Sequence, residues 1–198
     1  MKALFTFLLL GQLTALAQPE ISPDDFAIWQ TVIQSVTPEK STKTTYIWHY
    51  IERNEVYNYK TMDGFRSSMK LLTDELFDGF NKRNWNRRKP IQLTVDGFRL
   101  AQPVVFLTPE LMTHYCGRVL NEGWWLNPSE LPNGGLVVRV SLPSYSRNGS
   151  TAFVLACLYQ PGRADQGYFI LSRQNDGSWR IEEKKIWWEA DTPDYTSR

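Results

Sequence analysis

The chain has 198 residues, with 22 lysines and arginines against 21 acidic residues and a formal net charge of +1. This length suits one domain with a core large enough to fold without disulfides or metals. Because nucleic-acid binding depends on a basic surface that neutralises phosphates, the near-zero charge excludes nucleic acid as a bulk partner.

Residues 1–17 have the three parts of an export signal. Lys2 supplies a positive charge, residues 3–10 form a short apolar run, and Ala15 and Ala17 are the small residues that precede a cleavage site. We therefore expect cleavage between Ala17 and Gln18, and a secreted or periplasmic product. An apolar run of about ten residues cannot span a bilayer that needs roughly twenty, and no longer run follows, so the mature chain is expected to have no transmembrane segment.

Three helices are predicted from capping residues and apolar spacing. The first begins at residues 22–25 (Ser-Pro-Asp-Asp), where a capping serine, a proline and two acids suit a helix N-terminus, and it ends before Pro38. The second begins after Thr73 and ends in the basic segment 82–89. The third begins at residues 108–110 (Thr-Pro-Glu). Each has one apolar stripe, which we assign to the core.

Strands are predicted over residues 44–53 and, as shorter extended segments, over 91–95 and 103–107. The C-terminal part is rich in β-branched and aromatic residues, which favour strands. Its turn signals are Asn148-Gly149 and Asp176-Gly177, in which glycine readily takes a positive φ and Asn or Asp tolerates one, and we expect a type I′ turn at Asn148-Gly149. These signals divide it into four strands, over residues 136–142, 150–159, 167–174 and 178–188.

The expected fold class is therefore α+β, with about three helices packed on an antiparallel sheet whose main part is this four-stranded C-terminal meander. The order of elements also suits a cone-shaped sheet like those of nuclear transport factor or cystatin, an analogy that does not fix function. Residues 18–190 are expected to form a single domain, and residues 191–198 a frayed tail.

No catalytic, metal or cofactor site is predicted. His49 and His114 are the two histidines, and neither lies in a metal-binding motif. The sequence has no Gly-x-Ser-x-Gly motif and no glycine-rich phosphate loop before a helix. An alternative is a hydrolase acting on an envelope polymer in the concave face of the sheet. It would require Asp165, Glu52 or Glu55 to lie beside a histidine in one cleft.

Cys116 and Cys157 are the two cysteines of the chain. In an exported protein an even number of cysteines allows one disulfide. Both cysteines also lie among apolar and aromatic residues, where cysteine packs as a small buried side chain. The sequence leaves both interpretations open.

The segment Lys82–Lys89 holds five cations and Trp85 within eight residues. A charged run of this kind is commonly a solvated loop. The alternative is a binding surface for an anionic glycolipid or an acidic glycan, in which Arg87 and Arg88 would be the main contacts.

Two tryptophan pairs, Trp124-Trp125 and Trp187-Trp188, are the other candidate binding residues. Adjacent strand residues point to opposite faces of a sheet, so Trp187 and Trp188 cannot both enter one core. Either both faces are covered locally, or one indole is exposed as a flat surface for a sugar ring or a partner aromatic.

Several stretches together carry a resemblance to known proteins: residues 25–29, 80–84, 107–111, 123–124, 151–154, 167–171 and 175–181. They resemble a group of exported bacterial proteins with no assigned activity. The group often has Cys-Gly pairs in the loop between the second and third meander strands, but residues 160–167 contain no cysteine. The resemblance implies export and this fold, and we expect a non-catalytic binding or interaction module of the cell envelope whose partner is a glycan, an anionic glycolipid or a protein.

Overall fold

The structure is a computed structural model, and it describes residues 21–37, 41–51, 67–84, 90–111, 131–133, 135–160 and 163–191. The helices are α1 (Pro23–Val36), α3 (Asp74–Asn84) and the 3₁₀ helix η1 (Val95–Gly97), and a further helix begins at Pro109. The strands are β1 (Thr45–Trp48), β2 (Tyr50–Ile51), β3 (Ile91–Gln92), β4 (Val104–Leu107), β5 (Leu136–Val140), β6 (Ser144–Tyr145), β7 (Thr151–Gln160), β8 (Arg163–Arg173) and β9 (Trp179–Asp191).

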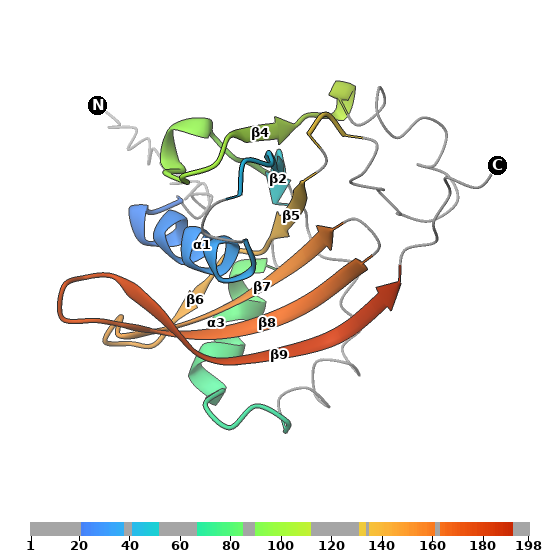
Figure 1. Cartoon of the computed structure of the whole chain (residues 1–198). Helices are drawn as coiled ribbons and strands as arrows, with labels where there is room; N and C mark the ends of the chain where they lie inside the picture. The colour runs from blue at the N-terminus through green and yellow to red at the C-terminus, as the bar shows by residue number, and fades with distance from the viewer. Residues whose placement is uncertain are drawn as a thin grey trace, which may run out of the picture.

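The α+β class is confirmed, and so is the C-terminal series of antiparallel strands (Figure 1). Strands β5, β7, β8 and β9 lie side by side in that order, and the short β6 pairs with β7. The main sheet as a whole is mixed rather than antiparallel, since β1 pairs in parallel with both β4 and β5. Parallel neighbours need long crossover connections, and the residues of a strand do not reveal which neighbour such a connection brings to it.

The predicted strand over residues 44–53 is interrupted at His49. Its first part, β1, lies in the main sheet, whereas β2 pairs with β3 in a separate two-stranded sheet. The backbone of His49 joins the two sheets: its N–H donates to the carbonyl of Leu107 (3.1 Å), and its own carbonyl accepts from the N–H of Leu93 (2.9 Å).

Helix α1 begins with a complete capping box. The Ser22 hydroxyl accepts from the Asp25 N–H (3.2 Å), and the Asp25 carboxylate accepts from the Ser22 N–H (2.8 Å). Its buried stripe contains Ile28, Trp29, Val32 and Ile33. The Ser22 cap is the one that the sequence predicts. Of the predicted apolar stripe, Trp29, Val32 and Ile33 are buried, whereas Phe26 and Val36 are partly buried and Ile28 is buried in addition.

The central strands β7 and β8 are apolar on both faces, because helices cover both sides of the sheet (Figure 1). Helix α1 packs on the face that presents Ala152, Val154 and Phe169. Helix α3 packs on the opposite face, which presents Phe153 and Tyr168. Successive side chains of each strand therefore enter the two apolar layers in turn. Such a strand appears in the sequence as a continuous apolar run.

Both predicted hairpin turns form, but the predicted type I′ turn at Asn148-Gly149 does not. Only the glycines have positive φ, +69° at Gly149 and +84° at Gly177. In each turn the residue before the glycine has an ordinary φ, and its side chain accepts from the N–H two residues later: Asn148 from Ser150 (3.1 Å) and Asp176 from Ser178 (2.9 Å). The asparagine and aspartate therefore contribute side-chain hydrogen bonds to these turns rather than a left-handed backbone.

No helix of the described segments is long and apolar enough to cross a membrane. The predicted export signal, residues 1–17, lies outside the described residues. The C-terminal strand extends to Asp191, and the tail that follows also lies outside them.

Candidate functional site

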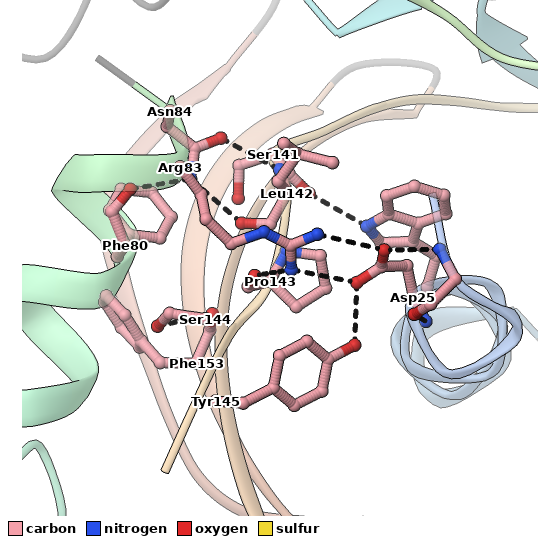
Figure 2. Close-up of polar contacts among 12 residues, drawn as sticks. Asp25, Phe80, Arg83, Asn84, Ser141, Leu142, Pro143, Ser144, Tyr145 and Phe153 are labelled. Carbon is pink, nitrogen blue, oxygen red and sulfur yellow. Dashed lines mark hydrogen bonds and ion pairs between the residues drawn. The ribbon is translucent and has the colours of Figure 1, made fainter. Parts of the chain in front are cut away.

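The most concentrated polar cluster of the described residues surrounds the fully buried carboxylate of Asp25 (Figure 2). Arg83 of α3 donates to both carboxylate oxygens (3.1 and 3.2 Å), and the Tyr145 hydroxyl donates to one of them (2.7 Å). With the bond from the Ser22 N–H, Asp25 accepts four hydrogen bonds. We call Asp25, Arg83 and Tyr145 the Asp25 cluster. It connects the start of α1 to the end of α3.

The segment that crosses between these helices, residues 141–145, is held by side chains from both of them (Figure 2). The Trp29 indole donates to the Ser141 carbonyl (2.9 Å). Asn84 binds Leu142 as a neighbouring strand would, accepting from its N–H (2.9 Å) and donating to its carbonyl (2.9 Å). Arg83 also donates to the carbonyl of Pro143. Because every bond joins parts of the fold, we assign the Asp25 cluster to structure rather than to ligand binding.

This assignment changes the interpretation of the basic segment 82–89. Arg83 lies within α3 and is used in the ion pair with Asp25, so it cannot serve an anionic partner without breaking the fold. Lys82 is exposed at the same helix end. The predicted contacts Arg87 and Arg88, with Trp85, lie outside the described residues.

A second group of polar and aromatic side chains lies across the main sheet, on the same face as α3. Register places Arg139 of β5 opposite Cys157 of β7, and Cys157 opposite Gln166 of β8. Trp48 lies at the end of β1, next to Arg139. Together with Tyr159, two residues after Cys157, these residues form what we call the Arg139 row.

Contacts within the Arg139 row hold the arginine against aromatic rings. The guanidinium carbon of Arg139 lies over the Trp48 ring, 5.4 Å from its centroid. A hydrogen bond joins Arg139 to the Tyr159 hydroxyl, and another joins Gln166 to Tyr168. Burial raises the pKa of Tyr159 to about 12, so its phenol stays protonated at neutral pH.

The Arg139 row differs from the rest of this face in its exposure. Where α3 covers the sheet, Phe153, Leu155 and Tyr168 are buried. Further along the same strands Cys157, Tyr159 and Gln166 are half-buried, and so is Arg139. Polar groups therefore meet the surface at the end of the sheet that α3 does not cover. They form a candidate ligand site.

The sequence did not identify this row, since its members are brought together by strand register. One signal was present: Arg139 is the charged residue in the otherwise apolar strand 136–140 (Leu-Val-Val-Arg-Val). A charge within a buried strand requires a partner or access to the surface.

The structure locates only some of the predicted tryptophan residues. Backbone register sets Trp188 opposite Gln166, so its position continues the Arg139 row onto β9, while Trp187 falls at an irregularity of the β8–β9 ladder. The side chains of both tryptophans lie outside the described part of the structure. Trp124 and Trp125 lie outside it altogether.

Of the two cysteines of the predicted disulfide, the structure describes one. Cys157 belongs to the Arg139 row, and Cys116 lies outside the described residues, so the disulfide stays a prediction. In the same row the charge of the Cys157 thiolate would oppose ionisation of Tyr159 and Tyr168, which raises the pKa of both phenols further.

The groups required by the hydrolase alternative are not adjacent where they are described. Asp165 lies three strands from Ile47 of β1, in the row that passes through Val138 and Leu158. At about 4.8 Å per strand, Ile47 and Asp165 are roughly 14 Å apart, and His49 follows two residues later, just beyond the end of β1. Within the described segments no group of three or more His, Cys, Asp or Glu side chains is arranged to hold a metal. Glu52, Glu55 and His114 lie outside them.

A search of protein-family models, curated proteins and solved structures finds no match to this chain.

Proposed function

We propose that this protein is a non-catalytic binding module that is exported to the cell envelope, as the resemblance to exported bacterial proteins suggests. Its ligand would be an envelope component, and the Arg139 row would be part of the binding surface. The alternative, a hydrolase of an envelope polymer, would act on the same kind of ligand.

The observation that carries the proposal is the half-buried polar row at one end of an otherwise apolar sheet. Half-buried arginine, tyrosine and glutamine side chains keep donors and acceptors at the surface, and the Arg139 guanidinium lies over the Trp48 ring. A few placed polar groups on an aromatic surface are typical of ligand sites.

The Asp25 carboxylate is not a candidate general acid or base. A carboxyl group in that role must lie within reach of a substrate. The Asp25 carboxylate is fully buried and accepts bonds from Arg83, Tyr145 and Ser22. Its hydrogen-bonding capacity is therefore used by the fold.

A binding panel with a turnover assay tests the proposal. The full chain would be titrated with polygalacturonate, dextran and phosphatidylglycerol vesicles, following tryptophan fluorescence, and each polysaccharide would then be analysed for new reducing ends. The expected result is saturable binding of one probe without new ends. New reducing ends would establish the hydrolase instead, and no binding to any probe would overturn the proposal.

Export is tested separately by the mass of the protein recovered from outside the cytoplasm. A mature chain that begins at Gln18 is expected. Recovery of the chain with Met1 in the cytoplasm would contradict it.

A further inference from the structure

We propose that Asn148 is a deamidation site that the folded β6–β7 hairpin closes to the reaction, and that the fold accepts the aspartate formed there. Asn148 and Ser150 are exposed at the tip of this hairpin, so water reaches the side chain. Asparagine followed by glycine is the pair most prone to this reaction, because glycine has no side chain to hinder the attack of its own backbone nitrogen.

Deamidation begins when the backbone nitrogen of Gly149 gives up its proton to a base in the solvent. Its lone pair then attacks the carboxamide carbon of Asn148, the C–N bond of the amide breaks, and ammonia leaves a five-membered succinimide. Water adds to one of the two ring carbonyls, the bond from that carbon to the Gly149 nitrogen breaks, and the nitrogen takes back a proton. Opening at the side-chain carbonyl gives aspartate, and opening at the backbone carbonyl gives isoaspartate.

The first support is that the folded hairpin holds both reacting groups. The N–H of Gly149 donates to the Ser146 carbonyl (2.8 Å), which keeps the proton on the nitrogen. The side-chain oxygen of Asn148 accepts from the hydroxyls of Ser146 and Ser150 (both 2.8 Å) and from the Ser150 N–H (3.1 Å). Closing the ring breaks the Gly149 bond and disturbs the three bonds of the carboxamide. The reaction therefore requires a local opening of the hairpin.

The second support is the β8–β9 hairpin, which already has an aspartate at the equivalent position. Asp176 accepts from the N–H and the hydroxyl of Ser178 (2.9 and 2.6 Å), and the N–H of Gly177 donates to the Gln174 carbonyl (3.0 Å). Bonds of the same kind, at the same spacing in the chain, form the β6–β7 turn. They lower the pKa of Asp176, the hydroxyl of Ser178 being the larger cause, so this turn stabilises a carboxylate. Aspartate at position 148 finds the same donors, whereas isoaspartate adds a carbon to the backbone and changes the spacing.

The first test measures the rate of deamidation by mass spectrometry of the tryptic peptide 148–163, in which Asn148 is the one asparagine. The full chain is incubated at mildly alkaline pH, both folded and in concentrated urea. We expect the folded chain to react at least about tenfold more slowly, since each opening breaks several hydrogen bonds. Equal rates in the two states would overturn the proposal that the hairpin closes the site.

Ser150→Ala removes the hydroxyl bond to Asn148 and should raise the rate in the folded chain by about threefold or more, while the unfolded rate stays within about twofold of wild type. The matched control is Ser178→Ala, which removes the corresponding bond from the β8–β9 hairpin. It should leave the rate at Asn148 within about twofold of wild type. An equal increase in the two variants would mean that general stability sets the rate, and would contradict a role for the local bonds.

Acceptance of the product is tested by urea unfolding of Asn148→Asp. Its midpoint should match that of wild type, whereas Asn148→Ala, which loses the side-chain bonds, should unfold at a lower urea concentration. An aspartate variant that unfolds as early as the alanine variant would overturn this half of the proposal. Circular dichroism confirms that each variant is folded, and if Ser150→Ala is not, the comparison of folded with unfolded wild type decides the question of the rate alone.

Discussion

Asp24 and Asp25 are neighbours in the first turn of α1, yet their side chains lie in very different surroundings. Both satisfy the preference for acids at a helix N-terminus, which is all that the sequence indicates for either of them. The structure buries Asp25 completely against Arg83, whereas Asp24 pairs with Arg173 at the surface, where the two side chains are 37% and 44% exposed.

Replacing Asp25 with asparagine should lower the free energy of unfolding by about 3 kcal/mol, because a largely buried arginine loses its counter-charge. Urea unfolding at neutral pH measures the change. The matched control is Asp24→Asn, where an exposed pair is lost and a change within about 0.5 kcal/mol is expected. Equal effects of the two substitutions would contradict the role of the Asp25 cluster.

The cap of α1 was predictable because Ser22 and Asp25 are three residues apart. The partners of Asp25 were not, since Arg83 is 58 positions away and Tyr145 is 120. No pattern within either helix indicates that the two helix ends meet across residues 141–145.

At the scale of elements, the β6–β7 and β8–β9 hairpins use the same local sequence, Asn148-Gly149-Ser150 and Asp176-Gly177-Ser178. In both, the serine hydroxyl donates to the side chain two residues earlier (2.8 and 2.6 Å). These bonds lower the pKa of Asp176, the larger cause being the Ser178 hydroxyl and the next the Ser178 N–H.

Gly177→Ala should destabilise the protein by about 1 kcal/mol, because alanine is strained at a φ of +84°. Nothing lies within 4 Å of the added Cβ, so no collision contributes. Urea unfolding measures the effect, and Gly177→Asn should recover part of the loss since asparagine tolerates this conformation better. An alanine variant as stable as wild type would contradict the turn geometry.

The outermost described strand, β9, is 13 residues long and has two irregularities in its pairing with β8. Long edge strands invite pairing with other chains, and charged side chains and bulges oppose it. Exposed charges occupy the middle of β9, at Arg180, Glu182, Lys184 and Lys185.

Replacing Lys184 and Lys185 together with valine should therefore promote self-association. Analytical ultracentrifugation over a range of concentrations would show a larger species that the wild-type chain does not form. The double glutamine variant keeps polar side chains and should stay closer to wild type. If the valine variant sediments as the wild type does, these charges do not protect the edge.

The order and approximate bounds of these elements were predictable, since caps, turns and apolar spacing are local signals. The strand over residues 44–53 was predicted too long because its break at His49 depends on bonds to Leu93 and Leu107. The parallel pairing of β1 was not predictable for a similar reason: it depends on where distant segments return to the sheet.

At the scale of the whole molecule, the burial of tyrosines makes the free energy of unfolding depend on pH in the alkaline range. Burial raises the pKa of Tyr159 to about 12, and it raises the pKa of Tyr145 and Tyr168 as well. In the unfolded chain these phenols ionise near pH 10. Their contribution to stability is thus complete below about pH 10 and is lost as the pH rises, through about pH 12 for Tyr159.

We expect the tyrosinate absorbance of the buried phenols to rise together with the loss of circular dichroism above pH 10. Tyr159→Phe removes one of these ionisations and should shift the alkaline midpoint upward. Reversible titration of every tyrosine near pH 10, with the circular dichroism unchanged, would contradict their burial.

The candidate site is a property of this whole-molecule arrangement. Trp48, Arg139, Cys157 and Gln166 come from four strands, and only the register of the sheet places them in one row. The sequence indicated aromatic and basic surfaces near Trp187 and Arg87, and the position of Trp188 at the end of the row connects one of these predictions to the site.

The most direct test of the binding surface is chemical-shift mapping of the ¹⁵N-labelled full chain during titration with a short oligomer of the polysaccharide that binds in the panel. Saturable shifts are expected at the backbone amides of Arg139, Cys157 and Gln166 and at the Trp48 indole, with little change at Asp25 or at the hairpin glycines. Shifts confined to the hairpins, or the absence of shifts in the Arg139 row when the ligand is bound, would contradict the account.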